Sequence, residues 1–528
     1  MSAARLRVQQ VGDGFAPYAW AASVEDVAAR HGIRPEAVLK FDQNTPPLPG
    51  VPQVPLARSM SRLEQYPDGT YRELREAAAA YVGLSADNVV VGAGADDLIL
   101  LVAQTFLGPG VRAAVDTPTY ALYGIATRLH GGTVVDLGDE AELRWVCNPN
   151  NPVGDWVGPD EIVELARREP QTTVVVDEAY VEYGARSCAP WVDELENLVV
   201  VRTMSKAFGF AALRVGYALA HPETAALLTE RRAPAPIAGP AAAIAAAALR
   251  DPRLGDVEAT IAERERMRAS LVSAGYEVAP TATNFLFVPT EEPLAERLEA
   301  EGIVVRSFPR GIRVSIRRPS ENDVLLRALG ADPGPPPGRD ATIIRTTTET
   351  AIRLTLSLDG QGRARVETGI GFLDHLLTLW AFHAGFDLEL LAGGDLGVDE
   401  HHTVEDVHAV LGAALAQALG SREDVARYGS AVVPMDEARA TAAVDLVRRP
   451  HAEISLAFGS DRVGALAVSL LRHALERFTI EAGCTVHVDS VGADDHHVAE
   501  AAYKSLGQAL RQAVAPGAAG IRSTKGAA

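Results

Sequence analysis

Residues 398–406 read VDEHHTVED, and residues 492–500 repeat the pattern as GADDHHVAE. In each copy an acidic pair, which favours a helix N-terminus, leads into His-His-x-x-Glu and an apolar helical pattern. The first His and the Glu stand four residues apart and share one face of a helix, where imidazole and carboxylate can bind one cation. The two adjacent histidines project roughly 100° apart and cannot easily reach the same ion. Each copy is therefore predicted to contribute to two metal sites.

A single histidine precedes each copy in a helix-like run, His375 in the first case and His473 in the second. Ten of the 13 histidines follow residue 370, so the enrichment is local. In a simpler interpretation the acidic residues cap two helices and the histidines lie on solvated first turns, but this leaves the duplication unexplained. The candidate ligands of the predicted dinuclear centre are His375, His401, His402, Glu405, His473, His496, His497 and Glu500.

The duplication predicts a tandem repeat, with copies at about residues 341–435 and 436–528. Turn residues at 359–362 and at 448–450 each separate two β-like runs, which predicts one hairpin in each copy. After each hairpin come the helix with the single His, one further strand and the His-His-x-x-Glu helix. We expect two ββαβα units that pack sheet against helices as an α+β domain. The expected strands are 350–358, 363–367, 387–391, 440–447, 452–457 and 484–488.

Residues 331–340, ADPGPPPGRD, predict a semi-rigid linker that joins two bodies without packing them together. Before it, the proline-rich stretch 45–55 is expected to be extended. Strand-like and helix-like runs alternate over about 46–240, which predicts an α/β large domain with a mostly parallel sheet. Residues 1–45 and 241–330 predict a smaller α+β domain. The expected strands are 88–91, 112–115, 133–137, 172–176, 198–202, 284–288, 303–306 and 312–316.

The composition excludes several classes of protein. The net charge of −20 and the lack of a basic cluster argue against a nucleic-acid partner. Three cysteines without paired spacing suit a reducing cytoplasm, and no apolar run is long enough for a membrane span. Only four of the 49 basic residues are lysine. Because a lysine can lose its proton and an arginine cannot, each lysine is a candidate for amine chemistry.

Lys206 and Asp177 predict a pyridoxal-phosphate site. Lys206 follows the expected strand 198–202, at the sheet edge where parallel sheets bind ligands, and a desolvated lysine there can condense with an aldehyde. Asp177 ends an apolar strand, where a carboxylate needs a cationic partner such as a protonated pyridine ring. Tyr180 and Asn151 are candidates for hydrogen bonds to the ring hydroxyl.

The phosphate of such a cofactor has its own predicted binding segment. Residues 92–96, GAGAD, turn from a strand into a helix whose free N–H groups favour an anion. Ser205 and Arg214 supply further donors. The nearby Asp68-Gly69-Thr70 is similar to a phosphatase loop, but position 66 is Tyr, so the nucleophilic aspartate is missing.

With these motifs, residues 1–330 resemble the fold-type I pyridoxal-phosphate aminotransferases, and most closely the histidinol-phosphate aminotransferases. The resemblance implies that Tyr120 stacks on the cofactor ring, that Tyr66 reaches the cofactor phosphate of a neighbouring subunit, and that Arg306 and Arg313 hold the substrate's anionic group. Residues 41–47, FDQNTPP, lack the tyrosine that some members place there. An aromatic aminotransferase or a phospho-amino-acid decarboxylase on the same scaffold therefore stays an alternative. The implied cofactor-binding residues are Tyr66, Ala95, Asp96, Tyr120, Asn151, Asp177, Tyr180, Thr203, Ser205, Lys206 and Arg214.

Residues 341–528 resemble the imidazoleglycerol-phosphate dehydratases, through TTTET at 346–350, GFLDH at 371–375, both HHxxE segments, PMDEA at 434–438 and STKG at 523–526. The resemblance places the eight ligands on metal positions and implies manganese, although Fe²⁺, Co²⁺ or Zn²⁺ also suit such ligands. It makes Glu349 a proton shuttle, beside the catalytic Glu405 and Glu500. It implies a cage-like assembly of trimers. The implied phosphate-binding residues are Arg427, Arg449, Ser523 and Lys525.

The two resemblances support each other, because the keto product of the dehydration is the substrate of the transamination. We therefore expect a cytoplasmic, bifunctional enzyme of histidine biosynthesis that takes phosphorylated imidazole substrates and glutamate or 2-oxoglutarate. A dimeric first half and a trimer-based second half predict a large homo-oligomer. The alternative in a different class is a non-catalytic, metal-binding assembly module fused to an aminotransferase of other specificity.

Overall fold

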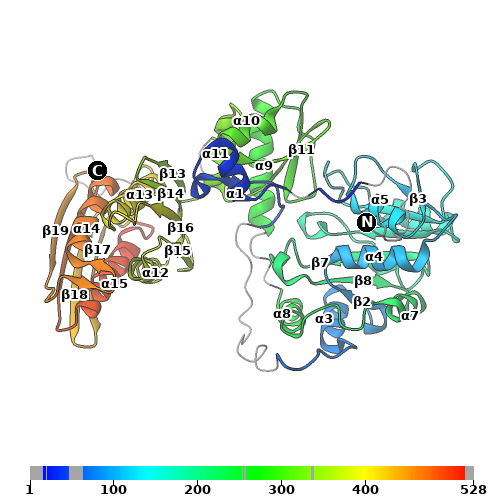
Figure 1. Ribbon diagram of the computed structural model, residues 1–528, viewed down its shortest axis with the longest axis horizontal. Coiled ribbons are helices and arrows are strands. Elements are labelled where there is room, and N and C mark those ends of the chain that lie inside the picture. Colours follow the sequence, from blue (N-terminus) through cyan, green and yellow to red (C-terminus); the bar gives the residue numbers. More distant parts are fainter. Residues whose placement is uncertain are drawn as a thin grey trace, which may run out of the picture.

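The computed structural model describes residues 16–19, 21–46, 63–252, 254, 257–334 and 338–517. Three bodies follow one another along its long axis: a large domain, a small domain and the C-terminal half (Figure 1). Most of the proline-rich stretch expected to be extended, and the expected phosphate-binding residues Ser523 and Lys525, lie outside the described residues. No helix among those described is long and apolar enough to cross a membrane.

The large domain is built on a seven-stranded sheet in the order β2-β8-β7-β6-β5-β3-β4. β8 runs antiparallel to both of its neighbours, and the other neighbouring pairs are parallel. The strands are β2 (Val89–Gly92), β3 (Arg112–Val115), β4 (Thr133–Val135), β5 (Leu143–Cys147), β6 (Thr173–Asp177), β7 (Leu198–Thr203) and β8 (Gly216–Ala220). The helices are α3 (Arg72–Val82), α4 (Ala95–Phe106), α5 (Leu122–Leu129), α6 (Pro159–Arg168), α7 (Pro222–Arg231) and α8 (Gly239–Arg250).

Two strands of this sheet, β5 and β8, are absent from the expectation. β5 contains Arg144, which interrupts the apolar pattern but is neutralised by Glu169 with an Nε–Oε2 distance of 2.6 Å. β8 reads GYALA, a composition with little β propensity, yet all five of its residues are buried. At the head of β8, a Cβ on Gly216 would lie 2.7 Å from the carbonyl carbon of Gly94. The missing side chain therefore lets β8 run directly beneath the predicted phosphate loop.

The small domain combines both ends of the N-terminal half. A three-stranded antiparallel sheet in the order β11-β12-β9 carries its core, and β1 pairs parallel with β10. Ser23, the residue before the first helix of this domain, forms a capping box with Asp26. The strands are β1 (Leu39–Lys40), β9 (Phe285–Pro289), β10 (Ile303–Val304), β11 (Arg306–Phe308) and β12 (Gly311–Ser315). The helices are α1 (Val24–His31), the 3-10 turn η1 (Pro35–Ala37), α9 (Val257–Ser273), α10 (Leu294–Ala300) and α11 (Pro319–Ala328).

The C-terminal half contains the predicted tandem repeat. Each copy forms a four-stranded sheet, in the order β13-β14-β16-β15 or β17-β18-β22-β19, and the helices of both copies share one apolar core with the two sheets. The first copy consists of β13 (Asp340–Thr346), β14 (Thr350–Ser357), β15 (Ala364–Glu367), α12 (Gly371–Ala384), β16 (Asp387–Gly394) and α13 (His401–Leu419). The second consists of β17 (Tyr428–Met435), β18 (Ala438–Asp445), β19 (His451–Leu456), β20 (Arg462–Val463), β21 (Leu466–Ala467), α14 (Val468–Ala482), β22 (Thr485–Val491) and α15 (Asp495–Ala513).

The predicted hairpins are wrong in both copies. β15 does not pair with β14 but runs parallel to β16, and β19 likewise runs parallel to β22. The true hairpins join β13 to β14 and β17 to β18, so each copy is βββαβα, with the short β20–β21 pair added before α14 in the second. The turn after β14 crosses the start of β16, where the carboxylate of Asp387 accepts the backbone N–H groups of Gln361 and Arg363, each at 2.9 Å. This turn carries the chain to the far edge of β16.

The two halves are in contact, so the expectation that the linker keeps them apart is wrong. Asp340, the first residue of β13, accepts the backbone N–H of Ser320 at the start of α11 with an Oδ2–N distance of 3.0 Å. The Ser320 hydroxyl hydrogen-bonds that of Thr342 at 2.8 Å, and both residues are buried. Ile344 packs against the small-domain core. β13 lies beside α11 in Figure 1. The domain boundaries themselves stay a prediction.

Candidate active sites

Six of the eight predicted metal ligands gather in two clusters, and each cluster draws on both copies of the repeat. In the first, His375 of α12 meets His496 and Glu500 of α15. In the second, His401 and Glu405 of α13 meet His473 of α14. Within each cluster the candidate ligand atoms all lie within 4.8 Å of one another. The helix with the single His in one copy therefore faces the His-His-x-x-Glu helix of the other copy.

The first cluster is centred on Glu500, which is almost fully buried. Its Oε1 lies 2.6 Å from His375 Nε2 and 3.0 Å from His496 Nε2, and its Oε2 accepts from Lys504 Nζ at 2.6 Å. Burial alone would raise the pKa of Glu500, but the hydrogen bonds from His375 and Lys504 lower it to about 2. A cavity of about 450 Å³, lined also by Phe372 and Val463, opens on the cluster.

The second cluster also consists of two imidazoles and one carboxylate, but the cation beside it is an arginine and not a lysine. Glu405 Oε2 lies 3.4 Å from His401 Nε2 and 3.3 Å from His473 Nε2. Its Oε1 is 3.2 Å from Nε of Arg477, one turn beyond His473 on α14. Two imidazoles and one carboxylate leave open positions on an ion of the Mn²⁺ or Fe²⁺ type, so the residues present fit a divalent metal.

A pair of equivalent glycines sets the helix crossings that form these clusters. A Cβ on Gly412 of α13 would lie 2.3 Å from the carbonyl oxygen of Phe478 on α14. A Cβ on Gly507 of α15 would lie 2.7 Å from the carbonyl oxygen of Trp380 on α12. Both glycines are helical, so the requirement is close approach and not a special backbone conformation. They allow each pair of helices to come close enough for the ligands to converge.

The two remaining predicted ligands, His402 and His497, point away from the clusters. His402 Nδ1 lies 3.0 Å from Asp395 Oδ2, and its Nε2 lies 3.8 Å from Glu349 Oε1. His497 Nδ1 lies 2.9 Å from Glu437 Oε2. The hydrogen bonds that these imidazoles donate to Asp395 and Glu437 raise the pKa of each imidazole. The two adjacent histidines of each motif thus point in different directions, as the helical geometry predicts.

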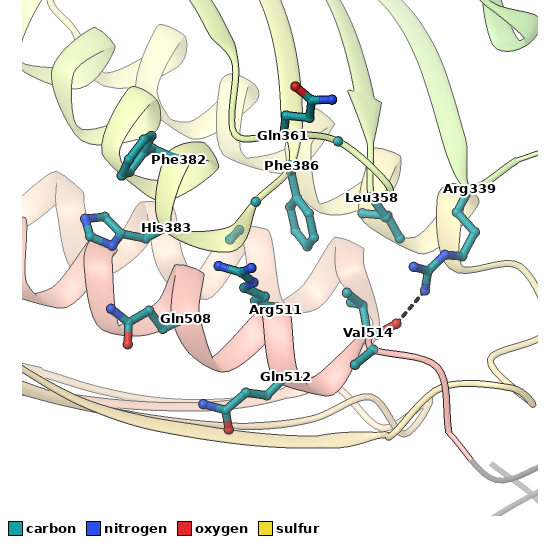
Figure 2. Close-up of a pocket in the computed structure, with 14 residues that line it drawn as sticks. Arg339, Leu358, Gln361, Phe382, His383, Phe386, Gln508, Arg511, Gln512 and Val514 are labelled. Carbon is teal, nitrogen blue, oxygen red and sulfur yellow. Dashed lines mark hydrogen bonds between the residues drawn. The ribbon is translucent and has the colours of Figure 1, made fainter. Parts of the chain in front are cut away.

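The expected phosphate-binding arginines are not brought to the clusters within one chain. Arg427 precedes β17, at the opposite end of that strand from Glu437, and pairs with Asp445 with an Nε–Oδ1 distance of 2.7 Å. Arg449 is exposed in the loop before β19. A second cavity, of about 510 Å³, lies near this far end, between α12 and the end of α15, and Figure 2 shows Arg511 and Gln508 on its wall. Neither metal cluster lines it.

In the large domain, Lys206 and Asp177 have the environments that a pyridoxal-phosphate site requires. Burial, with a smaller contribution from the charge of Arg313, lowers the pKa of Lys206 to about 8. Burial raises the pKa of Asp177 to about 6, although Tyr123 donates to it at 2.7 Å and the Ala179 N–H at 3.1 Å. Among the described residues Asp177 forms no ion pair, so a protonated pyridine nitrogen fits beside it. Tyr123 carries no motif, and sequence reasoning missed it.

Polar residues from both domains meet beside Lys206. Its Nζ lies 5.6 Å from the centre of the Tyr180 ring. The hydroxyl of Tyr180 accepts from Asn44 at 3.1 Å, a second residue that sequence reasoning missed. Arg313 donates from Nη1 to Asn151 Oδ1 at 2.5 Å, which brings the small domain onto the predicted cofactor loop. Arg306 lies directly opposite Arg313 on the neighbouring strand.

The predicted phosphate loop has free donors and a nearby cation. Gly94 precedes α4 without a side-chain cap, so the N–H groups from Ala95 onward remain available to an anion. Asp96 accepts from Arg214 at 2.9 Å and from the Tyr120 hydroxyl at 3.0 Å. Nearby, the hydroxyl of Thr203 hydrogen-bonds that of Ser205 at 3.0 Å. These residues fit the cofactor phosphate.

Tyr66 is the predicted cofactor residue that stands apart. It is 94% exposed, and none of the residues that the structure describes buries it. The expectation that it serves a neighbouring subunit stays a prediction.

Comparisons with known proteins divide the chain in the same way. The family described as aminotransferase class I and II matches residues 35–329, and the family of imidazoleglycerol-phosphate dehydratase matches residues 368–510. The imidazoleglycerol-phosphate dehydratase of Geobacillus kaustophilus is 47% identical over 191 residues, which are 36% of this chain and 98% of that protein. The dehydratase of Phytophthora nicotianae is 50% identical over 190 residues, but the match spans only 42% of its length.

Among solved structures, the histidinol-phosphate aminotransferase of Sinorhizobium meliloti in complex with pyridoxal-5′-phosphate is 26% identical, with a TM-score of 0.52. The match covers 60% of this chain and 97% of that one. The large and small domains thus have the fold-type I architecture expected from the motifs. The chain belongs to the class I and II aminotransferases through its N-terminal half and to the imidazoleglycerol-phosphate dehydratases through its C-terminal half.

Proposed function

We propose that the chain catalyses two consecutive steps of histidine biosynthesis. The C-terminal half dehydrates imidazoleglycerol phosphate to imidazoleacetol phosphate, and the N-terminal half transaminates that ketone with glutamate to histidinol phosphate. The observation that carries the proposal is the presence of both sets of site residues on one chain. The product of the first reaction is the substrate of the second.

In the dehydratase half, the two clusters are proposed to hold two divalent ions, with Mn²⁺ as the expected metal. When bound, the ions would act as Lewis acids and as a template for the substrate imidazole. His375, His496 and Glu500 hold one ion, and His401, Glu405 and His473 hold the other. Glu349, half exposed beside His402, is placed to move a proton at the reacting carbons.

In the aminotransferase half, pyridoxal phosphate would supply an electron-withdrawing ring. Asp177 stabilises the protonated ring nitrogen, and the N-terminus of α4 with Ser205 and Arg214 holds the phosphate. Lys206 moves the proton at the substrate's Cα, which its lowered pKa permits near neutral pH. The Tyr180 hydroxyl and Asn151 orient the ring, while Arg306 and Arg313 bind the anionic end of the substrate.

The second histidine of each motif supports the proposed assembly. His402 and His497 lie outside the clusters of their own chain, and the arginines expected to bind phosphate lie far from them. A site completed by neighbouring subunits, in a trimer-based cage, would use all of these residues. Exposed Tyr66 is consistent with a dimeric aminotransferase half. We therefore propose a large cytoplasmic homo-oligomer.

The test is a coupled assay on the full-length protein loaded with Mn²⁺ and pyridoxal phosphate. Imidazoleglycerol phosphate and glutamate should give histidinol phosphate and 2-oxoglutarate. Lys206→Ala should stop the sequence at the ketone, and Glu500→Gln should prevent the ketone from forming. Failure to form the ketone would leave the C-terminal half a metal-binding module. Preference for unphosphorylated aromatic keto acids, or release of CO₂ from a phosphorylated amino acid, would reassign the N-terminal half.

A further inference from the structure

Arg34, on the small-domain face that contacts the C-terminal half, reaches the dehydratase half with both ends of its guanidinium. The residue lies in the short segment between α1 and η1. Its Nη1 donates to the carbonyl of Gly393 at 3.0 Å, and its Nη2 donates to the carbonyl of Thr348 at 3.2 Å. One side chain of the aminotransferase half therefore bridges two separate segments of the dehydratase half.

Both segments lead to the partners of His402. Thr348 lies in the turn between β13 and β14 and immediately precedes Glu349, whose Oε1 lies 3.8 Å from His402 Nε2. Gly393 lies near the end of β16, two residues before Asp395, whose Oδ2 lies 3.0 Å from His402 Nδ1. The bridge thus fixes the distance between the residues that face the two nitrogens of one imidazole.

The equivalent turn in the second copy is held by contacts from within the dehydratase half. There Glu437, between β17 and β18, accepts the backbone N–H of Asp494 at 2.9 Å with Oε1 and contacts His497 with Oε2. Within the described residues, the carboxylate of Glu349 has no hydrogen bond of that kind, only the 3.8 Å approach to His402. In the first copy the turn is closed by the Thr347 hydroxyl, which accepts the N–H groups of Glu349 and Thr350 at 3.2 and 2.9 Å, and Arg34 joins this turn to the small domain.

The surrounding interface keeps Arg34 in place. Arg353 of β14 donates to the carbonyl of Val38, just after η1. A Cβ on Gly393 would lie 2.5 Å from Glu36 Oε1, so the end of β16 passes directly under η1. With the Ser320–Thr342 hydrogen bond, these contacts join the halves along β13, β14 and β16, up to the end of β14 at which Arg34 lies. Figure 1 shows α1 and α11 next to β13 and β14.

We propose that Arg34 is a positioning residue of the dehydratase site, so that the aminotransferase half completes the site of the other activity. The proposal rests on the proposed dehydration. A guanidinium suits the task because its N–H donors are held in one rigid plane and can serve two acceptors at once. An ammonium at the same place is a point charge on a flexible stem and cannot hold both carbonyls at a fixed distance from each other.

The test compares Arg34→Ala and Arg34→Lys with Arg30→Ala in the full-length protein loaded with Mn²⁺ and pyridoxal phosphate. Arg30 is the matched control, because it is an exposed arginine of α1 that pairs with Glu299 within its own half. For Arg34→Ala we expect kcat of dehydration to fall about tenfold, with KM, bound metal and transamination within about a factor of two of the native values. Arg34→Lys should be intermediate, and Arg30→Ala should match the native protein.

Hydrogen exchange supplies the readout that does not depend on turnover. In Arg34→Ala, amides 347–350 and 393–395 should exchange faster, while those at 435–438 should not change. A native dehydration rate together with native exchange in Arg34→Ala would overturn the proposal. So would an equal loss of transamination, which would mean general unfolding of the small domain. If the native protein does not dehydrate the substrate, the proposed function fails, and the exchange comparison alone decides whether Arg34 fixes the turn.

Discussion

Replacing Arg306 by Ala should weaken binding of the phosphorylated ketone and leave the fold intact. Arg306 and Arg313 lie directly opposite each other on β11 and β12, and Arg313 is buried, which lowers its pKa. Two facing cations repel each other unless an anion lies between them. A charge-assisted hydrogen bond to that anion contributes about 1.5–3 kcal/mol, which corresponds to a rise in KM of about 10- to 150-fold.

The assay measures KM for imidazoleacetol phosphate and for glutamate separately, beside a thermal melt. We expect the KM for glutamate to change little and the melting temperature not to fall, because Arg306 is half buried and its removal relieves the repulsion. Arg310→Ala is the matched control, since Arg310 is exposed in the turn of the same hairpin. Equal increases in both KM values would refute the assignment and indicate a shared carboxylate-binding role. A similar rise in KM for Arg310→Ala would mean that the effect of Arg306→Ala comes from general surface charge.

Three further outcomes are expected. Lys206→Ala should abolish transamination and the visible absorbance of bound cofactor while dehydration continues. In the native protein, because the pKa of Lys206 is about 8, uptake of cofactor by the cofactor-free form should accelerate as pH rises through 8. Normal transamination by the variant would contradict its role. Chelation should stop dehydration and spare transamination. The Glu500→Gln variant should bind less metal by elemental analysis, and an unchanged metal content would contradict the role of this cluster as a metal site. Gly507→Ala should lower the free energy of unfolding, measured with denaturant, by about 1–3 kcal/mol and should weaken metal binding, since its Cβ would lie 2.7 Å from the Trp380 carbonyl oxygen. Native stability and native metal content in this variant would show that the helices can move apart without loss.

The sequence predicted best those features that are encoded locally. β7 begins with the apolar run 198–201 and is buried at every position. β5 could not be recognised in this way, because Arg144 becomes acceptable in a buried strand through its ion pair with Glu169, which lies beyond the following helix, and through the carbonyls of Leu137 and Asp139. The hairpin predictions failed for a related reason. A turn signal shows where the chain bends, but not which strand edge it reaches.

The site was predictable to the same extent. The four-residue spacing identified His401 with Glu405 and His496 with Glu500, but it could not tell which single histidine completes each cluster, because that depends on how the helices cross. Tyr123 and Asn44 carry no motif and act only through contacts made by the fold. Arg34 left no signal at all, since both of its acceptors are backbone carbonyls of the other half.

The cross-copy construction of the clusters limits what half of the repeat could do alone. A chain with only one copy would have the His-His-x-x-Glu helix and the single-His helix, but these face different clusters in the folded protein. Such a chain could complete a cluster only by associating with a second copy of itself, in the arrangement that α12 and α15 adopt here. Joining two copies in one chain makes that association intramolecular, so the six ligands of the two clusters come together independently of protein concentration. It also frees each copy to diverge, as Lys504 beside one cluster and Arg477 beside the other already do.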